Sequence, residues 1–353
     1  MGAESIEASF LSIFALISFF IFLIVSKYSH KIKEGVLLDK DFSKPQAFHD
    51  FPVTRSGGIA TIISLSFFFI IYYILYSEVL YDYIFISYSV FIVGVLDDLR
   101  MNIKPLKRLI IMILLLFIFI YFLPIKILYI DIPFLIPLIS NQIFSSIFVL
   151  LCFLFVINGA NLIDGFNGLL TINIIIINII LAYININNQN SEFSFLIISQ
   201  IIILLSFLLF NFPSAKIFLG DSGAYTMGAL TGLNTIITNN LNPKISSFFF
   251  CTLLFYLFFE VFFSFVRKLL QKKSPIYPDD KHLHMLSFYK ISSIFGKNKG
   301  NYLNSIIVNI LYLVLIIPGL YLLDDPQLSR YWFFTLLLIY LLIYSRLFRL
   351  TKN

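Results

Sequence analysis

The chain has 353 residues, of which 59% are hydrophobic and 12% charged, and its mean hydropathy is +0.93. This composition excludes a soluble globular protein of this length and predicts a chain that crosses a membrane several times. The net charge is +6, and the chain has two cysteines. Cys152 and Cys251 lie inside apolar runs, which argues against a disulfide framework or a thiolate metal site.

Apolar runs long enough to cross the hydrocarbon core of a bilayer recur along the chain. The first run follows Glu4 and Glu7 instead of positive charge, which favours a retained helix over a cleaved signal peptide. We therefore predict an all-α, polytopic integral membrane protein, with a single membrane domain over residues 1–353 and about 11 transmembrane helices. The predicted spans are 8–26, 59–76, 82–96, 108–123, 139–157, 168–184, 194–210, 223–239, 246–265, 302–323 and 331–348.

The distribution of lysine and arginine predicts the orientation, with the N-terminus outside and the C-terminus cytoplasmic. In that orientation all 25 Lys and Arg residues except Lys126, Lys244 and Arg330 lie in or beside cytoplasmic segments. The positive-inside rule favours this arrangement. All four histidines fall on the same side, so we expect the active face there. The cytoplasmic connections are predicted at 27–58, 97–107, 158–167, 211–222 and 266–301.

The first connection contains Pro45, Pro52 and the pair Gly57-Gly58, which predicts an irregular ordered loop instead of a helix. As a basic flank it would only set the topology of the chain. His49 and Arg55 could instead contact phosphate, and the loop sequence leaves both readings open.

The third predicted helix ends in two neighbouring carboxylates, Asp97 and Asp98. Such a pair is unfavourable unless solvent, cations or a divalent metal offset its charge. Mg²⁺ commonly binds one or two carboxylates together with substrate phosphates, and Lys107 could hold those phosphates. The alternative is a solvated helix end paired with Arg100 or Lys104.

The stretch from Asn158 to Leu169 is polar and interrupted by glycines, although it joins two apolar runs. Hydrocarbon would leave the N–H and C=O groups of such a backbone unpaired, so we expect a hinge that faces a water-filled site. The hinge carries Asn161, Asp164 and Asn167.

The connection from Asn211 to Ala224 brings Asp221 to the start of a helix made of small residues. Free backbone N–H groups at a helix start suit an anionic ligand. Phe218 could stack on a base, although a phenylalanine in this chain is more often a core or lipid-facing residue. Asp221 is equally consistent with an ordinary helix N-cap.

The longest connection carries His282 and His284. Histidines there could bind metal, act as acid or base, or donate to phosphate, and they could equally lie on a solvated face. Zinc is the second choice of metal, because no cysteine is available and the nearby carboxylates lack a compact ligand spacing.

The joint order of these motifs resembles the polyprenyl-phosphate N-acetylhexosamine-1-phosphate transferases. The similarity covers about residues 40 to 290. It implies that an oxygen of undecaprenyl phosphate attacks the sugar-side phosphorus of a UDP-sugar and that UMP leaves, which begins a lipid-linked cell-wall, teichoic acid or O-antigen sugar. The motifs are Phe48-His49 through Gly57-Gly58, Gly94 through Asp98, Asn161 through Gly165, Asn211 through Gly223, and Pro278 through His284.

Within this family, Ala215-Lys216 and eleven helices are similar to the branch that uses simple UDP-N-acetylhexosamines, so we expect a donor like UDP-N-acetylglucosamine. The alternative is the phospho-N-acetylmuramoyl-pentapeptide transferase branch of peptidoglycan synthesis, which usually has ten helices. Many members have aspartate at the position of Asn167 and histidine at that of Met285. These departures leave the donor open, with a modified 6-deoxy-N-acetylhexosamine among the alternatives.

The resemblance implies roles for the site residues in an Mg²⁺-dependent glycosyl-1-phosphate transferase, with Mn²⁺ as a substitute cofactor. Asp221 and Asp98 would bind the metal, and Asp97 is the family's suggested base. A phosphate monoester is mostly deprotonated at pH 7, so which aspartate acts as base, if any does, stays open. The implied catalytic set is Asp97, Asp98, Asp164, Asp221 and His282. The implied substrate-binding set is His49, Arg55, Lys107, Asn161, Asn167, Asn211, Lys216, Phe218, Gly220 and His284.

These inferences place the protein in a bacterial cytoplasmic membrane, with its active site on the cytoplasmic face. The expected partners are a UDP-N-acetylhexosamine, undecaprenyl phosphate and membrane lipid, with no nucleic acid, and a homodimer stays open. A transporter would need polar groups at mid-depth, where the sequence offers almost none; Glu260, near the inner end of its helix, is the single candidate. A non-catalytic scaffold would not need five acidic or histidine clusters on one side.

Overall fold

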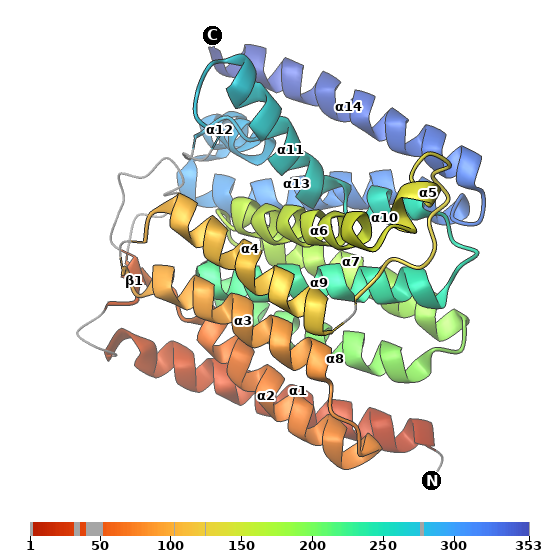
Figure 1. The fold of residues 1–353 in the computed structure, drawn as a ribbon. Coiled ribbons are helices and arrows are strands. Elements are labelled where there is room, and N and C mark those ends of the chain that lie inside the picture. The colour runs from red at the N-terminus through yellow and green to blue at the C-terminus, as the bar shows by residue number, and fades with distance from the viewer. Residues whose placement is uncertain are drawn as a thin grey trace.

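A helix lies at each of the eleven predicted spans in the computed structural model, which describes residues 3–31, 36–39, 52–101, 103–123, 125–275 and 279–352 (Figure 1). The helices at these spans are α1 Ala3–Tyr28, α2 Gly57–Tyr76, α3 Tyr81–Asp98, α4 Pro105–Phe122, α6 Gln142–Ile163, α7 Leu169–Asn187, α8 Ser191–Asn211, α9 Gly220–Leu241, the pair α10 Ser247–Leu253 and α11 Phe255–Leu270, α13 Lys297–Tyr321 and α14 Pro326–Lys352. The connections add α5 Ile136–Ile139, α12 Leu283–Phe295 and an antiparallel pair of strands, β1 Leu38–Asp39 and β2 Val53–Thr54.

The all-α polytopic class is confirmed, and the count of eleven spans stays a prediction. Within the described ranges, eight helices are long and apolar enough to cross a membrane, or nine if α10 and α11 form one span. The two remaining helices, α3 and α9, are more polar. Helix α9 is buried along almost its whole length against α3, α6, α7 and α2, so it needs little apolar surface.

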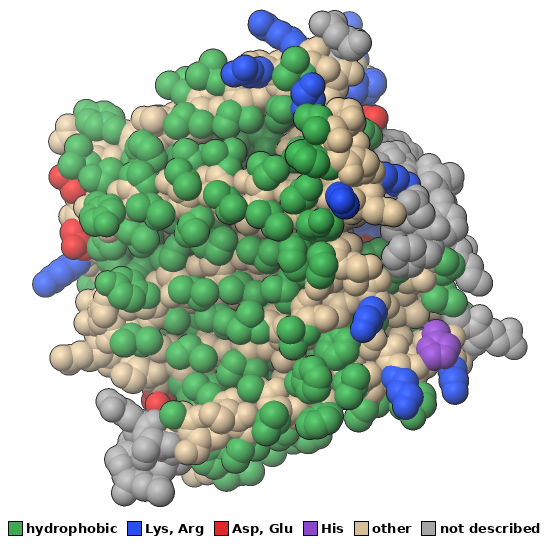
Figure 2. All heavy atoms as spheres, turned by 180° about the vertical axis from the view of Figure 1, so that it is seen from behind, with side chains coloured by type: hydrophobic (Ala, Val, Ile, Leu, Met, Phe, Trp, Pro, Cys, Tyr) green, Lys and Arg blue, Asp and Glu red, His purple; other side chains and the backbone are tan. Residues whose placement is uncertain are grey.

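Successive long helices run in opposite directions, so the connections predicted to be cytoplasmic meet at one end of the bundle (Figure 1). We call this the basic end: α3 ends there, and α4 and α9 begin there. Figure 2 shows apolar side chains over the middle of one face of the molecule, with most of the visible Lys and Arg side chains along the top and right-hand edge. The described part of the structure therefore separates an apolar belt from a basic end.

The hinge predicted from Asn158 is wrong over its first half, because α6 continues without interruption to Ile163. Gly159 does not break the helix. A Cβ atom at this position would lie 2.2 Å from the carbonyl oxygen of Leu257, so the glycine permits α6 to contact α11 closely. The turn itself is confined to the residues between Asp164 and Gly168.

Two further expectations differ from the structure at the C-terminal side. The single span predicted at 246–265 is two helices, α10 and α11, which are bent by 76°. At this break the hydroxyl of Tyr312 donates a hydrogen bond to the carbonyl of Leu253, the last residue of α10. The side chain of another helix thus supplies a partner for this carbonyl. The connection 266–301 contains the unpredicted helix α12, whose first turns are buried from Leu283 to Phe288.

Almost no polar groups are expected at mid-depth from the sequence, and the structure contradicts this expectation for uncharged side chains. Asn234 of α9 donates to Gln200 of α8 at 2.8 Å and accepts from the hydroxyl of Tyr83 at 2.8 Å. Asn178 of α7 lies in the same buried network. These amides bond to one another and tie four helices together, as polar side chains do inside membrane bundles.

Candidate active site

The start of α9 is organised by Asp98, which comes from the last turn of α3. The backbone N–H of Asp221 donates to Oδ1 of Asp98, and that of Ser222 donates to Oδ2, both at 3.0 Å. The Ser222 hydroxyl adds a bond of 2.6 Å to Oδ2. The free N–H groups at a helix N-terminus are thus satisfied by a carboxylate from another helix. Asp98 therefore fixes the position of Asp221.

Gly220 is required by this arrangement. Its φ is +76°, a left-handed conformation that glycine adopts without strain. A Cβ atom at this position would also lie 2.7 Å from Oδ2 of Asp98. The structure thus explains Gly220 by the fit of α9 against α3.

Arg108, in the first turn of α4, forms ion pairs with both Asp97 and Asp221. Its Nη1 atom lies 2.7 Å from Oδ2 of Asp221 and 2.9 Å from Oδ2 of Asp97. The side chains of Asp97 and Asp221 are 30% and 16% exposed, whereas that of Asp98 is 0% exposed. We call Asp97, Asp98 and Asp221 the acidic centre; its two partly exposed members, Asp97 and Asp221, converge on one cation.

The loop that precedes α2 borders the acidic centre through Arg55. The Arg55 guanidinium binds Asp39 at 2.6 Å, and its Nη1 atom lies 4.0 Å from Oδ1 of Asp98. Burial alone would lower the pKa of Arg55, but the nearby carboxylates, Asp221 foremost, raise it. The guanidinium is therefore a fixed positive charge beside the acidic centre.

Backbone pairing aligns the same loop with the segment before α9. The N–H of Phe218 donates to the carbonyl of Thr54 at 2.8 Å, and that of Gly58 donates to the carbonyl of Leu219 at 2.8 Å. Phe218 is half-buried, and Lys216, two residues earlier, is exposed. Arg55 and these two residues are thus brought to the same end of the bundle.

The turn between α6 and α7 is tied to the segment after α8 by two asparagines. Asn211 accepts from the N–H of Gly168 at 2.7 Å, and Asn167 donates to the carbonyl of Pro213 at 2.9 Å. Asn161, in the last turn of α6, and Asp164, at the start of this turn, are half-buried. Burial, followed by the charge of Asp221, raises the pKa of Asp164 well above its usual range.

Both predicted histidines are buried. Nδ1 of His282 lies 3.0 Å from Glu260, and Nε2 lies 3.3 Å from Asp279. Nδ1 of His284 lies 3.1 Å from the Tyr256 hydroxyl. Burial lowers the pKa of His284 to about 3, so its ring is neutral at pH 7. These contacts fix the segment before α12 to α11.

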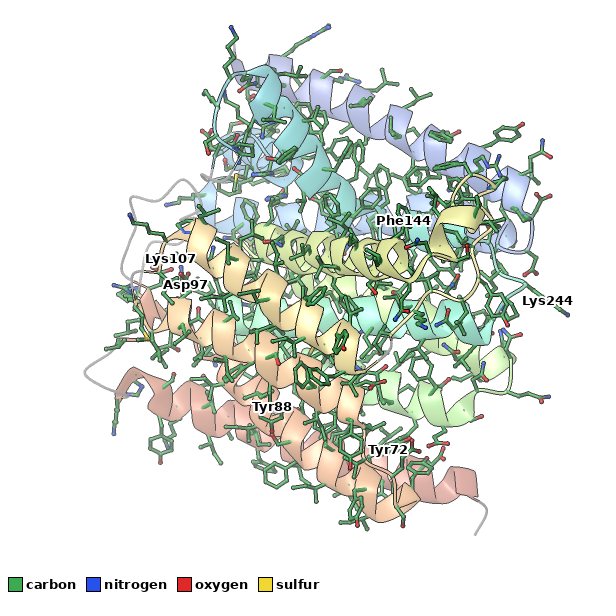
Figure 3. The ribbon with its side chains drawn as sticks, viewed as in Figure 1. Tyr72, Tyr88, Asp97, Lys107, Phe144 and Lys244 are labelled. Atoms are coloured by element: carbon green, nitrogen blue, oxygen red, sulfur yellow. The ribbon has the colours of Figure 1, made fainter. Side chains whose placement is uncertain are left out.

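Two predicted residues remain, Lys107 and His49. Lys107 is exposed, and Figure 3 shows it with Asp97 at the same end of the bundle, far from Lys244. His49 lies outside the described residues, as does half of the first connection.

Arg108 is a site residue that was not predicted, because in the sequence it counts only as a topological charge. The available signal was its place in the first turn of the helix that follows Asp98, where a long side chain can reach back to the end of α3. The role of Glu260 was missed as well, since it lies 22 residues from His282 in the chain.

The acidic centre suits Mg²⁺ in its donor chemistry, since the metal prefers oxygen ligands and is commonly bound by one or two carboxylates with phosphates completing its shell. Asp97 and Asp221 meet this requirement, because their oxygens already converge on one positive group. Within the described residues no group of three or more His, Cys, Asp or Glu side chains is arranged to hold a metal alone. Water and substrate phosphates commonly complete the shell of a protein-bound Mg²⁺.

Comparisons with known proteins identify a family and several named relatives. The model of the family described as glycosyl transferase family 4 matches residues 80–239. An undecaprenyl-phosphate alpha-N-acetylglucosaminyl 1-phosphate transferase of Thermotoga maritima is 27% identical over 278 residues, which are 78% of this chain and 80% of the relative. A phospho-N-acetylmuramoyl-pentapeptide-transferase of Dictyoglomus turgidum is 30% identical over 240 residues, which are 63% of this chain and 73% of the relative.

Proposed function

Since this chain belongs to glycosyl transferase family 4, we propose that it transfers a sugar 1-phosphate from a UDP-N-acetylhexosamine to undecaprenyl phosphate and releases UMP. The product would be the first lipid-linked intermediate of a cell-envelope polysaccharide. The name of the Thermotoga maritima relative, which shares most of its length with this chain, supports this acceptor and an N-acetylglucosamine donor.

The observation that carries the proposal is the convergence of Asp97 and Asp221 on Arg108 at the basic end. The reaction brings a phosphate monoester and a diphosphate together, so the site must offset several negative charges in a loose transition state. Arg108 and Arg55 supply fixed positive charge on two sides of the acidic centre. Asp97 would orient the attacking phosphate, whose oxygen needs little help to lose a proton at pH 7.

We assign Mg²⁺ to Asp97 and Asp221, in place of the pair Asp98 and Asp221 that the family resemblance implied. Asp98 is buried and accepts three hydrogen bonds from the start of α9, so its part would be to hold Asp221 in place. Bound Mg²⁺ would supply positive charge to the phosphate oxygens and orient the diphosphate.

We place the nucleotide-sugar along the neighbouring segments at the basic end. Asn161 and Asp164 lie at the end of α6 and the start of the turn before α7, and Phe218 is half-buried beside the acidic centre. Phe218 would stack on uracil, as aromatic side chains do on bases. Asn167 and Asn211 would act by holding these segments together, as their hydrogen bonds suggest.

The basic end would face the cytoplasm, in a bacterial cytoplasmic membrane. Lysines and arginines gather there, which the positive-inside rule favours. UDP-sugars and UMP would then enter and leave from the aqueous side, while the prenyl chain stays in the lipid.

The proposal is tested by measuring UMP release from purified protein with undecaprenyl phosphate, Mg²⁺ and a panel of UDP-sugars. We expect release with UDP-N-acetylglucosamine, loss of release in Asp221→Asn, and retention in Asp324→Asn, which removes an exposed carboxylate at the opposite end. Full activity of Asp221→Asn would contradict the assignment of the site.

The second candidate function is transfer of phospho-N-acetylmuramoyl-pentapeptide, because relatives named for that activity also match this chain. The relative from Leuconostoc mesenteroides is 37% identical over 111 residues, which are 29% of this chain and 35% of the relative. UMP release with UDP-N-acetylmuramoyl-pentapeptide and none with simple UDP-N-acetylhexosamines would favour this second function.

A further inference from the structure

Glu260 of α11 is a buried carboxylate that lies apart from the acidic centre. It is 1% exposed, and three donors from two other segments surround it. Its Oε1 atom accepts from the N–H of Leu283 at 3.1 Å and lies 3.0 Å from Nδ1 of His282. Its Oε2 atom accepts from the hydroxyl of Tyr340 at 2.6 Å. A buried carboxylate with this many partners has a fixed orientation.

A second carboxylate, that of Asp279, lies on the opposite side of the His282 ring. Nε2 lies 3.3 Å from Oδ1 of Asp279, and Arg267 binds both oxygens of Asp279 at 2.7 and 3.2 Å. The ring stacks on His284 with 5.6 Å between centroids and 4° between planes. The His282 ring thus lies between two carboxylates, with a hydrogen bond to Glu260 at Nδ1 and Asp279 near Nε2.

The last helix, α14, reaches this group from a distant part of the chain. Tyr340 is 5% exposed, and its ring packs against Phe259 of α11 with centroids 4.9 Å apart. One turn later, the hydroxyl of Tyr344 donates to the carbonyl of Lys281 at 3.0 Å. Helix α14 thus contacts both Glu260 and the residue before His282.

We propose that Glu260 and Tyr340 are positioning residues for His282, so that α14 is part of the support of the active site. The inference rests on the proposed function, in which His282 belongs to the catalytic set. Glu260 holds the orientation and proton arrangement of the His282 ring, and Tyr340 holds Glu260. Neither residue touches the substrate.

A double-mutant cycle tests whether Glu260 acts through His282. We expect Glu260→Gln to lower kcat roughly 10- to 100-fold, the usual effect of losing a hydrogen bond to a charged partner, and Tyr340→Phe to lower it less. In a His282→Gln background, Glu260→Gln should cause no further loss. Equal fold-losses by Glu260→Gln in both backgrounds would overturn the inference.

Two conservative variants control for a general effect on the fold. Glu192→Gln removes another carboxylate that accepts from a tyrosine, Tyr72, at the opposite end of the bundle. Tyr331→Phe removes an exposed hydroxyl from α14 itself. Both should keep the kcat of the unchanged chain, and a comparable loss of kcat in either one would overturn the inference.

A second measurement does not depend on turnover. The chain has four histidines, so ¹⁵N-histidine NMR with His282→Gln as the assignment control can identify the His282 ring. We expect Nδ1, which faces Glu260, to carry a proton in the unchanged chain, and the His282 signals to change in Glu260→Gln. An identical His282 signal in Glu260→Gln would overturn the inference even in a chain that releases no UMP.

The two proposals fail in different ways. Absence of UMP release from the unchanged chain contradicts the proposed function, and the NMR result then decides the positioning role. UMP release that His282→Gln leaves intact contradicts the positioning inference alone.

Discussion

Arg108 is the residue on which the charge balance of the acidic centre depends. It lies within 3 Å of Asp97 and Asp221, which would otherwise repel each other. Its planar guanidinium can serve both carboxylates and, with substrate present, phosphate oxygens. Arg108 therefore contributes both to the packing of the acidic centre and to its proposed chemistry.

We expect Arg108→Ala to lower kcat by about 100-fold, since removing one fixed donor from a transition-state charge typically has an effect of this size. Arg108→Lys should keep part of the activity, because lysine supplies the charge without the planar fork. The measurement is UMP release at saturating substrate. Lys104→Ala, which removes a nearby exposed cation, is the control and should retain its rate. Equal rates in Arg108→Ala and Lys104→Ala would contradict this role.

Asp98 and Asp221 should respond differently to the loss of charge. In Asp98→Asn, an amide would replace an oxygen that accepts from the start of α9, and loss of hydrogen bonds to a charged group costs about 1.5–3 kcal/mol each. We expect a lower unfolding temperature in detergent, together with lost activity. Asp221→Asn should lose activity with little change in that temperature. The assignment fails if the two variants unfold at the same temperature.

At the scale of elements, the contact between α2 and α9 depends on Gly58. A Cβ atom at Gly58 would lie 2.1 Å from Oγ of Ser222 and 2.4 Å from the backbone nitrogen of Gly223. Backbone atoms cannot move away easily, so an alanine there must separate the two helices.

We expect Gly58→Ala to lower the free energy of unfolding by about 1–3 kcal/mol, the usual cost of overpacking a core. The measurement is the unfolding temperature in detergent. Gly319→Ala is the control, because a Cβ atom there would meet its neighbours at 3.4 Å or more. A Gly58→Ala variant as stable as Gly319→Ala would contradict the observed packing.

The positions of the long helices could be predicted from the sequence because hydrocarbon requires long apolar runs. The extension of α6 to Ile163 could not be predicted, since the role of Gly159 as a close contact with α11 is visible only in the fold. The hydrogen bond from Tyr312 at the break between α10 and α11 likewise joins residues distant in the chain. Asp97, Asp98 and Asp221 stood out as carboxylates at helix ends, whereas Arg108 resembled one more basic residue beside a membrane span.

At the scale of the whole molecule, the chain combines an apolar belt with a basic end that gathers the candidate catalytic residues (Figures 1 and 2). The arrangement suits an enzyme that joins a water-soluble donor to a lipid acceptor. Helices α3 and α9 bring the acidic centre together, and the remaining bundle supplies apolar surface for the lipid.

The orientation is tested by the reactivity of single cysteines toward a membrane-impermeant thiol reagent. In a chain with Cys152 and Cys251 replaced by alanine, Lys244→Cys and Lys299→Cys place an exposed thiol at opposite ends of the bundle. In intact cells without their outer membrane or wall, we expect Lys244→Cys to react and Lys299→Cys to react only after lysis. The reverse pattern would contradict a cytoplasmic basic end.

The most direct test of the central claim is to follow the β-phosphorus of UDP-N-acetylglucosamine labelled with ³²P. Purified protein, undecaprenyl phosphate and Mg²⁺ should move the label into the lipid phase, and Asp221→Asn should leave it in the aqueous phase while Asp324→Asn should not. Label that stays in the aqueous phase with every protein, or that enters the lipid equally well with Asp221→Asn, would contradict the account.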